Sequence, residues 1–322
     1  MSMMESTFDI FGLTGHLYGV CAAAALLILV AGMRIFGRSL PKGTAGLYGV
    51  LAAVLGIAGA RILYCVCNLS TFTETFENPW LMLCFFDGGL SMPGAILGLI
   101  AAALLTAKVQ KVPAARMMDM LCLPLGLALA VIRYGEQFTD LGVGKAVAEG
   151  FATASLPWLF QQSRMGVAVE YRLNVWAYEA VAGLILFAAA LLVYPKLRRR
   201  AGDTALFFFS LFGAVQVLME SMRDDGHMLL IFLRVGQLAA ALMPLIACGF
   251  LTRRPISARS KWIAWILLIA CAGAIVVLEF SLDGRLTFGT PTLLRDYSMM
   301  AAVCAVLFAV PCTLLFSAEQ KA

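Results

Sequence analysis

The sequence predicts an all-α, polytopic integral membrane protein, and two observations support that prediction. Hydrophobic residues make up 61% of the 322 residues and charged residues only 13%, whereas soluble proteins contain about 25% charged residues. Apolar runs long enough to cross a bilayer as a helix, about 17–25 residues, recur along the whole chain. No stretch between them is suited to form a separate soluble domain.

Nine apolar runs are expected to be membrane-spanning helices. They cover 17–36, 44–67, 84–106, 114–133, 174–194, 204–222, 228–251, 262–281 and 297–317. The fourth run contains Pro124 and Gly126, which membrane helices tolerate. The stretch 134–173 is the longest that is not expected to be helical, and Met1–His16 lacks the basic region of a cleavable signal peptide. The first run is therefore expected to remain as a span.

The basic residues predict the orientation in the membrane. Fifteen of the 24 Lys and Arg residues fall in the connections 34–42, 107–116, 195–202 and 252–261 or in the C-terminal tail, and loop 68–83 has none. Cytoplasmic connections are enriched in Lys and Arg, so we expect the N-terminus outside and the C-terminus in the cytoplasm. The net charge of +5 mostly reflects this bias and does not indicate a nucleic-acid partner.

Polar side chains of the spans collect at the expected outer level. They are His16, Tyr18, Arg61, Asp87, Arg133, Glu136, Asp140, Glu179, Glu220, Arg223, Arg234 and Gln237. Snorkelling of a helix-end arginine explains Arg61 taken singly, and a carboxylate that complements a helix dipole explains Glu179. Neither explains why so many polar residues converge on one level, which indicates a functional site open to the outer leaflet. The inner halves of the spans are nearly bare apart from Asp119. Arginines with carboxylates suit a phosphate head group, which the planar guanidinium binds in a bidentate way.

Two spacings refine this site. Gln216, Glu220 and Arg223 fall at i, i+4 and i+7, which predicts one face of the sixth span. Arg234 and Gln237 fall at i and i+3, which predicts one face of the seventh.

Neither a metal nor another cofactor is expected. The chain has two histidines and nine cysteines, and the cysteines are scattered without the spacing of a metal site. Cysteine in such helices behaves as a small apolar residue.

Seven stretches, with matching order and spacing, resemble the prolipoprotein diacylglyceryl transferases. They are "AGARILYCVCN" at 58–68, "NPWLMLCFFDGGLSMPGAILGLI" at 78–100, "LPLGLALAVIRYGEQF" at 123–138, "LPWLF" at 156–160, "NVWAYEAVAGL" at 174–184, "VLMESMRDDG" at 217–226 and "RVGQLAAALMPLI" at 234–246. "HLYG" at 16–19 resembles the entry to the first span of that family. The resemblance covers about residues 10–251.

The resemblance implies an activity and partners. Family members transfer a diacylglyceryl group from phosphatidylglycerol to the lipobox cysteine in the signal peptide of a prolipoprotein, at the outer leaflet of the bacterial plasma membrane. It also implies about seven family-like spans followed by two extra ones. We expect a transferase-like membrane domain at 1–254, with 134–173 as an extracytoplasmic insert, and a two-span extension of accessory role at 255–322.

The resemblance also assigns roles to residues. Arg133 and Arg223 are expected to bind the phosphate. Glu220 or Glu136 is expected to orient them, and one of these two or Glu179 is expected to be the base, with the choice left open. Further substrate-binding candidates are Arg61, Asp87, Gly88, Gly89, Tyr18, Arg234 and Gln237. Asp87 would cap the third span, and the N–H groups of Gly88 and Gly89 at a helix N-terminus would favour a phosphate.

Four positions depart from the family pattern. Pro93 replaces a His, Glu136 an Asn, Gln216 a frequent Arg and Trp176 a Gln. Either Glu136 or Arg234 has taken over the missing chemistry, or the chain is a catalytically inactive or re-purposed lipid-binding or assembly protein on the same scaffold. A transporter is a weaker third reading, since no inverted repeat is evident.

Overall fold

The protein divides into two compact units. The computed structural model describes residues 6–10, 13–70, 72, 79–84, 88–149, 153, 155, 156, 158–165, 168–225, 229, 230, 233–286 and 293–319. The first unit comprises Met1–Gly202 and Arg223–Leu230, and the second comprises Asp203–Met222 and Ile231–Ala322.

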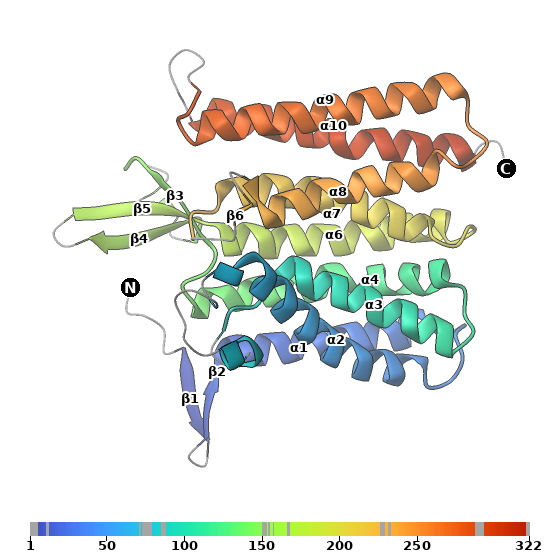
Figure 1. Ribbon diagram of the computed structural model, residues 1–322, viewed down its shortest axis with the longest axis horizontal. Helices are drawn as coiled ribbons and strands as arrows, with labels where there is room; N and C mark the ends of the chain where they lie inside the picture. Colours follow the sequence, from blue (N-terminus) through green and yellow to red (C-terminus); the bar gives the residue numbers. More distant parts are fainter. Residues whose placement is uncertain are drawn as a thin grey trace. The chain divides into compact units, whose positions relative to one another are not determined.

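Five long helices form the body of the first unit (Figure 1). They are α1 (Leu17–Phe36), α2 (Thr44–Cys67), α3 (Met92–Val109), α4 (Ala114–Gly135) and α6 (Val175–Leu197). The helix α2 packs against α3, and α4 packs against both α1 and α6. Glycines permit the close approach: a Cβ at Gly98 of α3 would collide with the carbonyl of Leu55 in α2, and one at Gly126 of α4 would lie 2.5 Å from the backbone nitrogen of Phe187 in α6. Small residues at such contacts are typical of helices that pack in a membrane.

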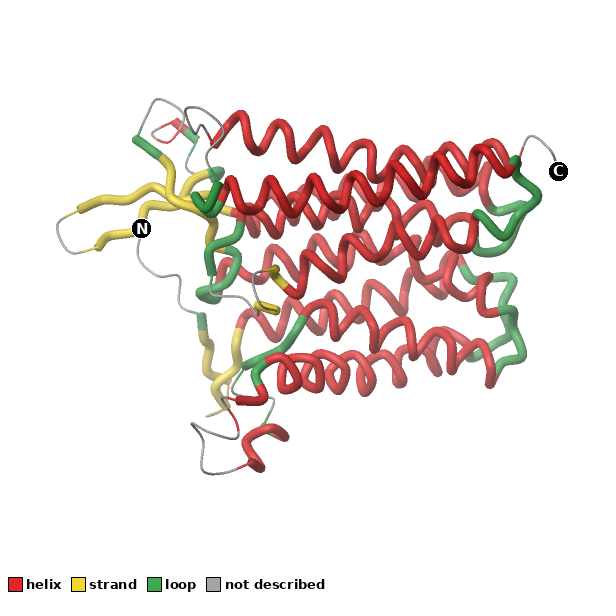
Figure 2. Tube along the Cα trace, turned by 45° about the horizontal axis from the view of Figure 1, so that its top comes forward, coloured by secondary structure: helices red, strands yellow, loops and turns green. Residues whose placement is uncertain are grey.

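Short strands lie at one end of these helices (Figure 2). The strands β1 (Thr7–Ile10) and β2 (Leu13–His16) form an antiparallel hairpin before α1. Within the predicted insert, β3 (Val143–Val147), β4 (Phe160–Met165) and β5 (Ala168–Asn174) form an antiparallel sheet in the order β3-β5-β4. Further elements in the described part of this unit are the 3₁₀ helices η2 (Pro79–Leu83) and η3 (Glu136–Phe138) and the short strand β6 (Leu229–Leu230). Because β5 runs directly into α6, the sheet is anchored to the helix that carries Glu179.

Among its described residues, the second unit contains four helices and the short strand β7 (Leu233–Arg234). The helices are α7 (Asp203–Met222), α8 (Val235–Leu251), α9 (Ala258–Leu282) and α10 (Leu293–Glu319). Both α8 and α10 pack against α7, and α9 packs against α10. A buried ion pair between Arg254 and Asp203 ties the end of α8 to the start of α7, and the Tyr297 hydroxyl in α10 donates to the Ser221 carbonyl in α7 at 3.3 Å.

The predicted fold class is confirmed. Among the described residues, eight helices are long and apolar enough to cross a membrane, and α8, with 17 residues, is shorter. The chain is therefore a multi-pass helical membrane protein.

Two of the expected helix starts are wrong. The third span was expected from residue 84, but α3 begins at Met92 because Gly88 and Gly89 adopt left-handed φ angles of 87° and 67°. The seventh was expected from residue 228, but α8 begins at Val235 because Arg234 before it is extended. In both cases the local backbone leaves the helical region although the residues are apolar enough for a span.

Candidate active site

Arg133 lies in the last turn of α4, where that helix meets α1. A Cβ on Gly135 would lie 2.7 Å from the Cβ of Cys21 and 3.4 Å from Cδ2 of Tyr18. Only glycine therefore lets the end of α4 approach α1 this closely. The same approach places the Tyr18 ring beside the segment that carries Arg133 and Glu136.

Arg223 reaches the site from the backbone that follows α7. The helix ends at Met222, Arg223 forms an isolated antiparallel bridge with Gly144, and the Asp224 N–H donates to the Val143 carbonyl at 2.8 Å. The expectation that Arg223 shares a helix face with Gln216 and Glu220 is therefore wrong, because pairing with β3 takes the chain out of the helix. Gln216 and Glu220 do share a face of α7, as the i, i+4 spacing predicted, since Gln216 Nε2 donates to Glu220 Oε1 at 3.1 Å.

Two carboxylates hold Arg133 and Arg223 side by side. Glu136 directs Oε1 to Arg133 Nη1 at 2.5 Å and Oε2 to Arg223 Nη2 at 3.1 Å. Glu179 directs Oε1 to Arg133 Nη2 at 3.0 Å and Oε2 to Arg223 Nη1 at 2.6 Å. Each carboxylate therefore bridges both guanidinium groups, and the four side chains form a closed ring of ion pairs.

Asp225 is a fifth member that sequence reasoning missed. Its Oδ2 accepts from Arg223 Nη2 at 2.8 Å, from Arg223 Nε at 3.1 Å and from the Gly142 N–H at 2.8 Å. The signal was present in "MRDDG", where two aspartates follow Arg223. The other aspartate, Asp224, pairs with Arg172 of β5 at 2.8 Å. Burial alone would lower the pKa of Arg172, but the hydrogen bonds that it donates to Glu170 and Asp224 raise it.

These five residues are called the arginine–carboxylate cluster: Arg133, Glu136, Glu179, Arg223 and Asp225. Their side chains are at most 6% exposed. With every group ionised, the two arginines and three carboxylates sum to one negative charge. Burying so many charges is costly even when they are paired, so such a cluster near the helix ends of a membrane protein indicates a functional site. A guanidinium that binds carboxylates in this geometry also suits phosphate oxygens.

Arg61 occupies a different environment in the first unit. It donates to four backbone carbonyls, those of Leu81, Met82, Gly88 and Gly89, at 2.6–3.1 Å. Its guanidinium also lies over the rings of Tyr64 and Phe72, at 5.7 and 5.5 Å from their centroids. Arg61 therefore fixes the course of the segment before α3.

The start of α3 corrects the predicted glycine site. The carbonyls of Gly88 and Gly89 face Arg61, and the two residues precede the helix rather than open it. The N-cap is Ser91, whose hydroxyl accepts from the Gly94 N–H at 3.4 Å, and Asp87 lies outside the described residues. Met92, the first residue of α3, contacts the Arg133 guanidinium through its sulfur.

Three predicted residues lie in the second unit. Glu220 in α7 has a buried Oε2 that no hydrogen-bond partner reaches among the described residues. Gln237 in α8 is buried and donates from Nε2 to Glu279 of α9 at 2.5 Å. Arg234 is the N-cap of α8 rather than part of it, so the expectation that it shares a helix face with Gln237 is wrong.

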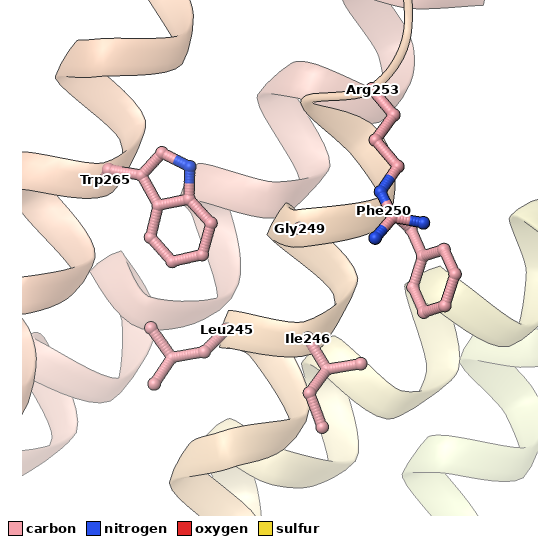
Figure 3. A pocket seen from close by; sticks show the side chains of 6 residues that line it. All are labelled: Leu245, Ile246, Gly249, Phe250, Arg253 and Trp265. Atoms are coloured by element: carbon pink, nitrogen blue, oxygen red, sulfur yellow. The ribbon is translucent and has the colours of Figure 1, made fainter.

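An apolar hollow lies elsewhere in the second unit (Figure 3). It is open, has a volume of about 340 Å³ and is lined by Leu245, Ile246, Gly249, Phe250, Arg253 and Trp265. None of the predicted site residues lines it. Its chemistry differs from that of the arginine–carboxylate cluster, because Arg253 supplies its only charge.

A family model described as prolipoprotein diacylglyceryl transferase matches residues 5–253. The chain belongs to this family. Proteins named phosphatidylglycerol–prolipoprotein diacylglyceryl transferase are among its relatives. The one from Symbiobacterium thermophilum is 30% identical over 243 residues, which cover 74% of this chain and 89% of the relative. The relative from Streptococcus equi subsp. zooepidemicus is 26% identical, over 77% of this chain and 93% of the relative. The relative from Thermotoga maritima is 27% identical, over 64% of this chain and 68% of the relative. The family match ends just before α9 and α10.

The departures from the transferase family pattern occupy defined places in this structure. Glu136 is a bridging member of the arginine–carboxylate cluster. Pro93 lies in the first turn of α3, where a missing N–H costs little. Gln216 pairs with Glu220, and Trp176 packs edge-to-face on Tyr134, with ring centroids 6.1 Å apart. Only the first of these four changes adds a charge to the cluster.

Proposed function

We propose that this chain transfers a diacylglyceryl group from phosphatidylglycerol to the lipobox cysteine of a prolipoprotein, with the arginine–carboxylate cluster as the phosphate site. One observation carries the proposal: Glu136 and Glu179 hold the guanidinium groups of Arg133 and Arg223 side by side in a buried setting. The names of the relatives support the same reaction. Two adjacent, buried guanidinium groups are what a departing phosphate needs.

The reaction places clear demands on the site. The cysteine thiol loses its proton, its sulfur forms a C–S bond to the terminal glycerol carbon of the diacylglyceryl group, and the C–O bond to the phosphate breaks. Glycerol phosphate leaves with an additional negative charge. A free thiol has a pKa of about 8.5, so a base must accept its proton, because the thiolate is the nucleophile.

The arginines serve the leaving group and the carboxylates serve the thiol. Arg133 and Arg223 are preorganised, so stabilising the departing charge requires little rearrangement of the protein at the moment of reaction. A phosphate that binds the two arginines competes with the carboxylate oxygens of Glu136 and Glu179, which engage both of them. A carboxylate that yields its place on an arginine to the phosphate can then accept a proton. The base is Glu136 or Glu179 on this argument, and Glu220 is the candidate from the second unit.

We place the protein in the bacterial plasma membrane with its N-terminus outside and its C-terminus in the cytoplasm. The support is the concentration of Lys and Arg in the connections α1–α2, α3–α4, α6–α7 and α8–α9. In this orientation the arginine–carboxylate cluster and the sheet β3-β5-β4 are on the outer side. A lipobox peptide presented at the outer leaflet then meets the phospholipid in the same layer, which supplies part of the rate by proximity.

The decisive experiment measures glycerol phosphate released from phosphatidylglycerol by the purified protein in the presence of a lipobox peptide. We expect release by the wild type, and loss of release by Glu136→Ala and Arg234→Ala with little loss of folded protein. A serine-for-cysteine peptide should give none. If the folded wild type releases no glycerol phosphate while the Symbiobacterium thermophilum relative is active in the same assay, the result would support a non-catalytic lipid-binding protein. The double variant Pro93→His with Gln216→Arg would then test whether activity can be restored.

A further inference from the structure

A buried hydrogen bond joins the family-matching part of the chain to the helices that follow it. Gln237 lies in α8, inside the residues that the family model matches, and Glu279 lies in α9, beyond them. Gln237 Nε2 donates to Glu279 Oε1 at 2.5 Å, and the two residues are 2% and 8% exposed. The extension therefore does more than cover an apolar face of α8.

The contact belongs to a larger polar layer in the second unit, formed by Gln216, Glu220, Gln237 and Glu279. Gln216 Nε2 donates to Glu220 Oε1, and the Glu220 carboxylate lies directly against Gly236, where any Cβ would collide with it. Gly236 is the residue before Gln237, so the backbone that carries the Gln237 side chain is packed on the Glu220 carboxylate. Three helices, α7, α8 and α9, each supply part of this layer.

We propose that Glu279 is a positioning residue for the transfer reaction: it fixes the orientation of the Gln237 amide within the polar layer that also contains Glu220. The inference rests on the function proposed above. Gln237 donates from its amide nitrogen to Glu279, so its amide oxygen remains as an acceptor that this hydrogen bond does not use. A carboxylate accepts but does not donate, and therefore selects one of the two orientations that the amide could adopt. The acceptor left on Gln237 and the unpartnered Oε2 of Glu220 suit hydroxyl or N–H donors of a substrate.

The placement of Glu279 differs from that of a residue that only holds helices together. Helices in a membrane associate mainly through small residues and close packing, and a carboxylate there is costly and marks function by default. The extension has its own polar contact for cohesion, since Ser281 donates to Asp296 between α9 and α10 at 3.0 Å. Glu279, two residues before Ser281, turns instead to α8.

A double-mutant cycle on the full-length protein tests the proposal. Rates of glycerol phosphate release, with kcat and KM for phosphatidylglycerol, are compared for the wild type, Glu279→Ala, Gln237→Ala and the double variant. We expect Glu279→Ala to lower kcat/KM about tenfold, the scale of one buried hydrogen bond with a charged partner. The double variant should be no slower than Gln237→Ala, because a residue that acts only through Gln237 has no effect once Gln237 is gone.

Two further variants separate positioning from packing. Glu279→Gln keeps the volume but can either accept or donate, so it should lose most of the effect of the carboxylate, whereas Glu279→Asp should retain part of it. Ser281→Ala removes an equally buried hydrogen bond of α9 and should leave the rate within about twofold. Additive losses of transfer rate in the double-mutant cycle would overturn this inference and leave the proposed function standing. A Glu279→Gln variant as fast as the wild type would do the same. Absence of transfer by the wild type would overturn the proposed function and this inference with it.

Discussion

Replacing Arg133 with lysine tests the phosphate site most directly, because it keeps the positive charge and removes the two-armed guanidinium that binds phosphate in a bidentate way. The guanidinium reaches Glu136 with Nη1 at 2.5 Å and Glu179 with Nη2 at 3.0 Å. A lysine ammonium is one point with three donors, and it cannot meet two carboxylates on two separate arms with the same geometry. At least one charge-assisted hydrogen bond is lost, about 1.5–3 kcal/mol.

We therefore expect Arg133→Lys to lower the free energy of unfolding by about 2 kcal/mol and the rate of glycerol phosphate release by about 100-fold or more. The rate loss exceeds the stability loss because the fork also meets the charge of the departing phosphate. Folded protein is measured by thermal unfolding in detergent, and release is measured with a lipobox peptide.

The matched control is Arg172→Lys, the same substitution at an arginine with the same kind of partners. Arg172 pairs with Glu170 at 3.0 Å and Asp224 at 2.8 Å, but its side chain is 21% exposed. Partly exposed ion pairs contribute only about 0–1 kcal/mol, so this variant should stay close to the wild type in both measurements. Wild-type release by Arg133→Lys would refute the assignment of Arg133 to the phosphate.

Three further predictions concern topology, the extension and one glycine. Reporter fusions at Lys145 in β3 and at Arg199 after α6 should report opposite sides of the membrane. Finding both reporters on the same side would contradict the predicted orientation. A chain that ends after Arg254 should still insert and bind phosphatidylglycerol, because no member of the arginine–carboxylate cluster lies in α9 or α10. Its transfer rate should fall at least as far as that of Glu279→Ala. Loss of lipid binding in a stably inserted truncation would show that the extension builds the lipid site. Gly236→Ala should give a folded protein with a large loss of transfer, because its Cβ displaces the Glu220 carboxylate, and a fully active variant would remove Glu220 from the mechanism.

The membrane-spanning architecture could be predicted because a helix in a bilayer needs about 20 apolar residues whatever its neighbours are. The helix starts could not be predicted in the same way. The break before α3 depends on Gly88 and Gly89, whose carbonyls bind Arg61 of another helix. The residues alone did not distinguish this arrangement from a helix that opens at Asp87.

The candidate site shows the same division between local and tertiary information. Collecting Arg133, Glu179 and Arg223 required only their common level in the membrane, and the structure brings them together with Glu136. Asp225 was not predicted as a site residue, because its role depends on the chain leaving α7 to pair with β3. That pairing joins residues about 80 positions apart, which no local pattern reveals.

The charge balance of the cluster leads to a prediction that separates the two possible bases. With all groups ionised the cluster carries one negative charge, so an anionic phosphodiester competes with the carboxylates for the two arginines. Glu136→Gln removes one competing charge and should strengthen binding of phosphatidylglycerol. If Glu136 is the base, the same variant should transfer slowly in spite of tighter binding. Glu179→Gln, which changes the other bridging carboxylate, is the matched comparison. Binding is measured as lipid retained in nanodiscs, and transfer as glycerol phosphate released. Slow transfer in only one of the two variants identifies the base, whereas weaker binding in both would contradict competition between the phosphate and the carboxylates for the arginines.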